Sequence, residues 1–203
     1  MPFPALFAAP LMGCYIAAFL VLTARSARDA GQPVWLFGRD RRQDLPALLF
    51  RLAFASELLY SLMLAFGVAP VGEFAVPPMP LRVAGLLLAL AGALFAIHAQ
   101  HHMGASWRIG SVEGHSGAIV DTGPFRLSRN PVFVGQALLF GGLLFVLPSL
   151  VQAAITLALL IAIQLQVAIE ERVLEADLGN PYRAYKQRVH RWLGSSGLKT
   201  EGT

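Results

Sequence analysis

The sequence predicts an all-α integral membrane protein: five transmembrane helices, the last two forming a C-terminal helical hairpin, followed by cytoplasmic amphipathic tail helices. Of the 203 residues, 56% are hydrophobic and only 14% are charged, whereas soluble domains are typically about 25% charged. The apolar residues are concentrated in runs of roughly twenty, the length that a helix needs to cross a bilayer. Helix is the expected structure for these runs, because an open strand leaves unpaired backbone groups in lipid.

The five predicted spans follow one another along the chain with short connections. They cover residues 3–22, 45–69, 81–99, 131–147 and 149–169. Only Pro148 and Ser149 separate the last two apolar runs, which predicts a tight hairpin. Small residues such as Gly85, Gly92, Gly141 and Gly142 suit close contacts between helices.

Connections that carry Lys or Arg alternate along the chain with connections that carry neither. Residues 24–44, residues 100–130 and the tail after the fifth run are basic, whereas residues 70–80 and the turn of the hairpin carry no Lys or Arg. The positive-inside rule therefore predicts an N-terminus outside and a C-terminus in the cytoplasm. The net charge of +4 fits this topology and anionic headgroups, so nucleic acid is not an expected partner. The first run lacks a basic region before it, so we interpret it as a retained span rather than a signal peptide.

A few polar residues interrupt the spans. Glu57 lies near the middle of the second run, where it either lines a substrate cavity or bonds to a neighbouring helix. Arg51 lies closer to the predicted cytoplasmic start of the same run and can extend its guanidinium to the interface. The single cysteine, Cys14, excludes an internal disulfide and a cysteine-based metal cluster.

Three histidines have helical spacing at the end of the third run: His98, His101 and His102. Such spacing can hold a metal ion, but no carboxylate or cysteine nearby completes the ligand set, so no metal site is predicted. His115, in the following polar segment, can assist binding or proton transfer.

The tail repeats apolar and aromatic residues at three- or four-residue intervals between residues 170 and 193. Gly179, Asn180 and Pro181 interrupt this pattern, which predicts two short helices. Their basic face favours a position in the headgroup plane, or the tail folds back over the polar loop as a lid that excludes water.

Four short motifs, in a fixed order, carry a family resemblance. The loop before the hairpin reads GAIVDTGPFRLSRNPVFVG (residues 117–135) and contains two of the motifs, at residues 119–125 and 129–135. The other two, Glu170–Glu171 and the tail motif LGNPYRAY, follow the hairpin. This order resembles the signature of the isoprenylcysteine carboxyl methyltransferase family, which belongs to a wider group with the phospholipid methyltransferases. The matching residues are Ile119, Val120, Gly123, Pro124, Phe125, Arg129, Asn130, Pro131, Phe133, Gly135, Glu170, Glu171, Leu178, Gly179, Tyr182 and Tyr185. The resemblance covers roughly residues 103–192; the first two spans match only in being hydrophobic.

The resemblance implies S-adenosylmethionine as cofactor and methyl donor. The residues expected to bind it are Gly117, Ala118, Ile119, Val120, Phe125, Asn130, Pro131, Val132, Phe133 and Glu170. Small side chains allow the backbone to approach an adenosine, aromatic faces suit a sulfonium, and a carboxylate suits the ammonium group. Arg129 and Gln166 are expected to contact the substrate; Arg129 equally suits the cofactor carboxylate or an ion pair with Glu170 or Glu171. No residue is assigned a catalytic role, because methyl transfer depends chiefly on alignment.

Four positions depart from the family pattern. Gln166 stands where the family has a basic residue that contacts the substrate, Asn130 replaces a histidine, and Phe125 and Phe133 replace tyrosines. The loss of a cation at residue 166 weakens the case for a carboxylate substrate.

We therefore expect an integral membrane methyltransferase with a cytoplasmic cofactor site. Its acceptor is a lipophilic molecule or lipid (a carboxylate, amine or thiol) that enters between helices. Residues 1–203 are expected to form a single membrane domain: residues 1–99 hold three spans, residues 100–193 hold the cofactor-binding loop, hairpin and tail helices, and residues 194–203 form a flexible tail. Two alternatives remain open: an NADPH-dependent reductase of the sterol-reductase type, for which this chain is short, and a non-catalytic membrane protein with the same fold.

Overall fold

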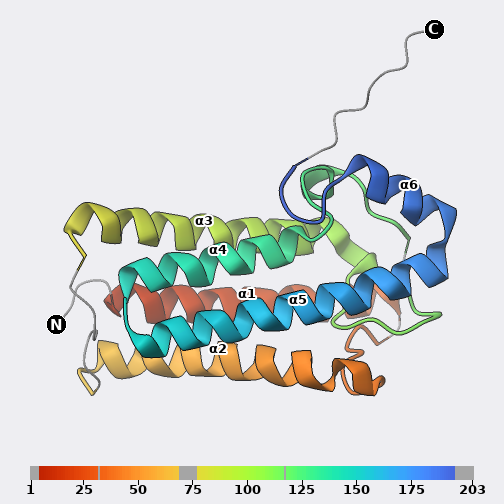
Figure 1. The fold of residues 1–203 in the computed structure, drawn as a ribbon. Coiled ribbons are helices and arrows are strands. Elements are labelled where there is room, and N and C mark those ends of the chain that lie inside the picture. The colour runs from red at the N-terminus through yellow and green to blue at the C-terminus, as the bar shows by residue number, and fades with distance from the viewer. Residues whose placement is uncertain (1–4, 32, 69–76, 117, 195–203) are drawn as a thin grey trace, which may run out of the picture.

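The computed structural model describes residues 5–31, 33–68, 77–116 and 118–194. Within these ranges the fold is all-helical apart from one isolated bridge between Trp35 and Ile109, which confirms the predicted fold class. Five long helices lie side by side and alternate in direction, and one short helix follows them (Figure 1). They are α1 (Ala5–Ala30), α2 (Asp44–Ala65), α3 (Met79–Met103), α4 (Pro131–Val146), α5 (Leu150–Leu178) and α6 (Asn180–Arg188).

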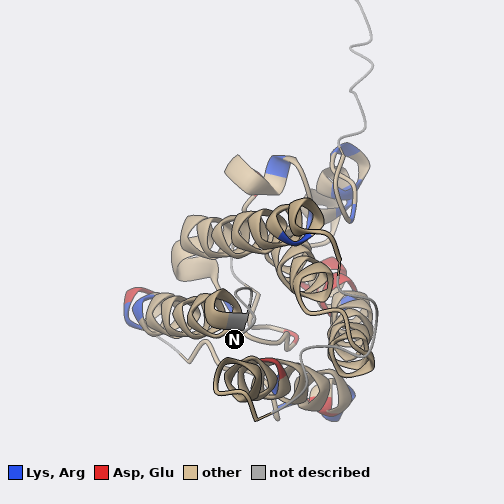
Figure 2. Cartoon of the chain, turned by 90° about the vertical axis from the view of Figure 1, so that its left-hand side faces the viewer, with Lys and Arg blue, Asp and Glu red and all other residues tan. Residues whose placement is uncertain are grey.

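Four of these helices are long and apolar enough to cross a membrane. The qualifying segments are Leu6–Ala30, Arg41–Ala65, Met79–Ser106 and Leu150–Leu178. Helix α4 has only 16 residues, or about 24 Å at 1.5 Å per residue, because Pro131 sets its start and the chain turns after Val146. The fifth predicted span therefore stays a prediction, although α4 lies among the other long helices (Figure 1). In the end-on view of Figure 2 most of the ribbon carries no charged residue, as expected for such helices.

Helices α3 and α4 approach closely through small residues. A Cβ atom added to Gly92 would lie 2.6 Å from the carbonyl oxygen of Gly135, and one added to Gly135 would lie 2.6 Å from the backbone nitrogen of Ala96. Gly85 and Gly142 face each other in the same way. A Cβ atom added to Gly141 would meet no other atom within 4 Å. Three of the four predicted packing glycines therefore lie in the contact between α3 and α4.

Buried polar groups join α2 to α5. Glu57 is fully buried and accepts hydrogen bonds from Ser61 Oγ at 3.2 Å and from Gln152 Nε2 at 2.5 Å. Tyr60 and Ser149 are also hydrogen-bonded, at 2.8 Å. Glu57 therefore bonds to a neighbouring helix, which was one of its two predicted roles.

The tail differs from its prediction. Helix α5 continues without a break to Leu178 and ends at Gly179, whose φ of 56° favours glycine. The prediction of two short tail helices was wrong for the first, because residues 170–178 contain no Gly or Pro and simply extend α5. Helix α6 is the separate tail helix, and it ends at Arg188. Of the predicted flexible tail, residues 195–203 lie outside the described residues.

The connections after α1, α3 and α5 gather at one end of the bundle (Figure 1). These are the arginine-rich segments, and they include the short helices η1 (Arg41–Gln43), η2 (Gly104–Ser106) and η3 (Gly123–Arg126). The antiparallel arrangement thus brings three segments that are distant in sequence to one end.

Candidate functional site

A cavity of about 460 Å³ lies beneath these connections and extends between the helices. Its walls come from α1, α2, α4, α5, α6 and the segment between α3 and α4. Every predicted site residue that the structure describes lines it: Ala118, Ile119, Val120, Phe125, Arg129, Asn130, Pro131, Val132, Phe133, Gln166 and Glu170. Gly117 lies outside the described residues. The Asn130 turn and Glu170 thus share one cavity at one end of the bundle.

Glu170 is held within this cavity by a chain of amides. Gln166, one helical turn earlier and 1% exposed, donates from Nε2 to Glu170 Oε1 at 3.0 Å and to Gln43 Oε1 at 3.2 Å. Gln43 in turn bonds twice to Ser111: its Nε2 donates to Ser111 O at 2.6 Å, and its Oε1 accepts from Ser111 N at 2.7 Å. The sequence reasoning missed Gln43, which links η1, the loop and α5.

Gln166 Oε1 is buried and has no hydrogen-bond partner among the described residues. An acceptor left unpaired in a cavity is suited to a ligand that donates a hydrogen bond there. Together with the Glu170 carboxyl, it gives this part of the cavity an acceptor-rich surface.

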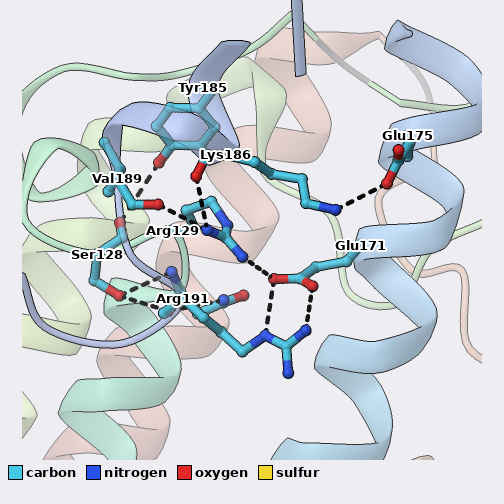
Figure 3. Close-up of polar contacts among 9 residues, drawn as sticks. Ser128, Arg129, Glu171, Glu175, Tyr185, Lys186, Val189 and Arg191 are labelled. Atoms are coloured by element: carbon cyan, nitrogen blue, oxygen red, sulfur yellow. Dashed lines mark hydrogen bonds and ion pairs between the residues drawn. The ribbon is translucent and has the colours of Figure 1, made fainter. Parts of the chain in front are cut away.

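Arg129 is held by an ion pair to α5 and by hydrogen bonds to the residues after α6. Its Nη2 lies 2.6 Å from Glu171 Oε1, and its Nη1 donates to Val189 O at 2.7 Å (Figure 3). Its backbone nitrogen donates to His190 O at 2.9 Å. Arg191 completes the group through Nη2 at 2.5 Å from Glu171 Oε2. The ion pair with Glu171, foreseen beside the substrate role, is thus present. Substrate contact by Arg129 stays a prediction, although its backbone and side chain already position the Asn130 turn.

Residues 189–194, here called the C-terminal strap, fold back over that turn. Ser128 Oγ and Asn130 Nδ2 both donate to Arg191 O at 3.1 Å, and Gly194 N donates to Leu127 O at 2.9 Å. The strap thus folds back on the polar loop, as in one of the two predicted arrangements of the tail; its action as a lid that excludes water stays a prediction.

The tyrosines of α6 are buried and stay uncharged. Tyr185 donates to Phe125 O at 2.8 Å, and burial raises its pKa well above the usual range. Burial, reinforced by the charge of Glu171, raises the pKa of Tyr182 to about 12. The hydrogen bond to Glu171 raises the pKa of Arg191 further above its usual value, so Arg191 keeps its positive charge at physiological pH.

The loop before η3 is anchored by Asp177, a second residue that the sequence reasoning missed. Its carboxylate accepts hydrogen bonds from Gly114 N at 2.9 Å and from Ser116 N at 3.3 Å. This contact fixes the loop that leads to Ala118, Ile119 and Val120 against the end of α5.

His102 packs against this loop through a hydrogen bond and a ring contact. Its Nε2 lies 2.9 Å from Thr122 Oγ1, and its ring stacks at 6.5 Å on Phe125. Gly123, at φ +55°, leaves room for the ring, since a Cβ atom there would lie 2.7 Å from it. In the described part of the chain no group of three His, Cys, Asp or Glu residues is placed to hold a metal ion.

The remainder of the cavity is largely apolar and aromatic. Phe133 stacks on Phe50 at 5.8 Å, and Tyr15 stacks on Phe54 at 5.9 Å. Between α1 and α2 the lining reaches Leu58, which also borders a second apolar groove formed by those two helices. The cavity therefore joins a polar end, at the loops, to an apolar end between helices.

Comparisons with known proteins give a family match and a short match to one relative. Residues 81–180 match the model of the phospholipid methyltransferase family. A 45-residue segment is 44% identical to a protein of Haemophilus influenzae (strain ATCC 51907 / DSM 11121 / KW20 / Rd) described as an uncharacterized protein, and it covers 22% of this chain and 71% of that protein. No solved structure matches the chain. The part of the chain from α3 to the end of α5, which supplies both the Asn130 turn and Glu170, therefore matches a family of membrane methyltransferases.

Proposed function

We propose that the protein is an S-adenosylmethionine-dependent membrane methyltransferase whose acceptor is lipophilic. The observation that carries the proposal is the shared cavity: the loop from Ala118 to Val120, the Asn130 turn and Glu170 surround one space of about 460 Å³. The family match over residues 81–180 supports methyl transfer over the reductase alternative.

The lining residues fit the chemical groups of S-adenosylmethionine. Glu170 and the unpaired Gln166 Oε1 offer acceptors to an ammonium group, and Phe133 offers an aromatic ring to a sulfonium. Ala118 and its neighbours offer a backbone that an adenosine can approach. The bound cofactor would supply an electrophilic methyl group.

The protein's own contribution is alignment and exclusion of water. The amide chain from Ser111 through Gln43 and Gln166 fixes the carboxyl of Glu170, and the C-terminal strap covers the Asn130 turn. Holding the reacting groups in one geometry supplies much of the acceleration of a displacement reaction. The apolar extension towards α1 and α2 gives a lipophilic acceptor a lateral route from the bilayer. We place the polar end of the cavity on the cytoplasmic side, since the three basic connections lie there.

The test is a binding titration with purified full-length protein. S-adenosylmethionine should bind saturably and NADPH should not; saturable binding of NADPH alone would replace the proposal with the reductase alternative. Glu170→Gln should weaken S-adenosylmethionine binding by about tenfold or more, because a charge-assisted hydrogen bond is lost. The matched control is Glu175→Gln, since Glu175 lies on the same helix but pairs with Lys186 and Arg183 instead of lining the cavity.

Incubation with labelled methyl donor and a membrane lipid extract then identifies the acceptor class. A labelled lipophilic product that disappears in Glu170→Gln supports the proposal. Cofactor binding without any labelled product would favour a non-catalytic membrane protein with this fold.

A further inference from the structure

The apolar end of the cavity contains one buried polar pair. Gln136 of α4 and Tyr15 of α1 are each 4% exposed, both line the cavity, and Gln136 Nε2 donates to Tyr15 Oη at 2.9 Å. Gln136 lies one helical turn beyond Val132 and Phe133, so it continues the face of α4 that carries the candidate cofactor residues. The pair therefore lies next to the candidate cofactor site, on the side of the acceptor route.

This pair is incompletely bonded. Gln136 Oε1 is buried and has no hydrogen-bond partner among the described residues. Tyr15 Oη accepts the hydrogen bond from Gln136, so its own O–H remains directed elsewhere. A buried acceptor without a partner is costly in an apolar environment, and a ligand that supplies the missing donor removes that cost.

Two of the three arginines that line the cavity are engaged elsewhere. Arg129 pairs with Glu171, and Arg108 donates to the carbonyl oxygens of Ala105 and Trp107 at 2.7 Å. Arg51 lines the cavity too, but it belongs to the exposed surface of α2. The nearest rings to Tyr15 are those of Phe54 and Phe19, at 5.9 and 6.2 Å.

We infer that Tyr15 and Gln136 bind the polar group of the methyl acceptor and select an uncharged group that both donates and accepts a hydrogen bond. Tyr15 donates to the acceptor's oxygen or nitrogen, and Gln136 Oε1 accepts its hydrogen. Phenols, alcohols and unprotonated amines meet both conditions, whereas a carboxylate offers no donor to Gln136 Oε1. The inference rests on the proposed function and narrows its substrate class.

Three ligands with alkyl chains of similar length test the selection: 4-dodecylphenol, 4-dodecylanisole, which lacks the donor, and dodecanoate, which is an anion without a ring. Their dissociation constants are measured with the full-length protein in detergent, with and without S-adenosylhomocysteine. Wild-type protein should bind the phenol at least about tenfold more tightly than dodecanoate, the factor expected for one well-formed hydrogen bond.

The variants separate the two roles. Gln136→Leu should weaken the phenol about tenfold and leave the anisole unchanged, while Tyr15→Phe should weaken both, because both ligands accept from Tyr15. Tyr15→Phe keeps the ring that packs on Phe54, so it reports on the hydroxyl even where Gln136→Leu is unstable. The matched control is Gln100→Leu: Gln100 is another buried glutamine, bonded to Phe19 O and Thr23 Oγ1, that does not line the cavity.

Two outcomes overturn the inference: tighter wild-type binding of dodecanoate than of the phenol, or phenol binding that both variants leave intact. A failure of the proposed function is distinct, because it is the absence of S-adenosylhomocysteine binding in the wild-type protein. Binding of S-adenosylhomocysteine that is unchanged in Gln136→Leu, Tyr15→Phe and Gln100→Leu supports a role towards the acceptor alone.

Discussion

Arg129 and Glu171 form a 2.6 Å ion pair between the polar loop and α5, and each side chain is only 9% exposed. Arg191 of the C-terminal strap reaches the second oxygen of the same carboxylate. One carboxylate on α5 thus holds the Asn130 turn and the strap together, directly beside Glu170.

Removing this carboxylate should loosen the whole end of the bundle. Glu171→Gln leaves the Arg129 guanidinium buried without its counter-charge, which should cost about 3 kcal/mol of stability. The measurements are the thermal midpoint in detergent and proteolysis near residue 190. Glu175→Gln is the control, since the side chains of Glu175, Lys186 and Arg183 are 33–59% exposed and such pairs contribute little. Equal midpoints for the two variants would contradict this role.

The α3–α4 contact predicts opposite effects for two glycines of one helix. Gly135→Ala places a methyl group 2.5 Å from Gly92 O, so the helices must separate, at a cost of about 1–3 kcal/mol. Gly141→Ala meets nothing within 4 Å and should be neutral or slightly stabilising, because alanine favours helix. Thermal unfolding of both variants checks the difference, and a stable Gly135→Ala would show that the helices separate freely.

Gln43 should affect ligand binding without touching the ligand. Gln43→Leu removes the hydrogen bonds to Ser111 and Gln166, so Gln166 and Glu170 lose their fixed orientation. We expect S-adenosylmethionine binding to weaken several-fold, as measured by titration. Gln152→Leu is the matched control, because Gln152 bonds Glu57 far from this chain of amides; similar losses in both variants would point to general destabilisation instead.

Reporter fusions test the orientation in the membrane. A green fluorescent protein fused after Thr203 should fluoresce, and an alkaline phosphatase fused after Val68, past the end of α2, should be active. The reverse pattern would move the polar end of the cavity to the outer side and remove its access to a cytoplasmic cofactor.

Much of the fold was predictable, because long apolar runs and their breakers act locally. Pro131, Pro148 and Gly179 set helix boundaries that single residues can signal. The extent of α5 was misjudged, because the predicted boundary followed hydropathy, whereas a helix continues through polar residues until a residue such as Gly179 ends it. Whether α4 spans a membrane was beyond the sequence for a related reason: its length is limited by the turns on either side.

The set of cavity residues was also predictable in part. The motif from residue 118 to 133 and Glu170 were identified by resemblance, and the structure brings them together. Tyr15 and Gln136 of the cavity lining were missed, as were Gln43 and Asp177, which hold the lining in place, since the contacts of these residues join segments that are far apart in sequence. One signal was available: glutamines inside apolar runs, such as Gln136, are rarely placed there without a partner or a ligand.

The C-terminal strap has a consequence for the order in which the site matures. Its carbonyl groups bond to Arg129 and Asn130, about sixty residues earlier in the chain. The loop that contains Arg129 and Asn130 is therefore synthesised well before the strap residues that bond to it. The emerging protein therefore passes through a stage in which the Asn130 turn is still uncovered, and the strap can dock only once residues 189–194 have been synthesised.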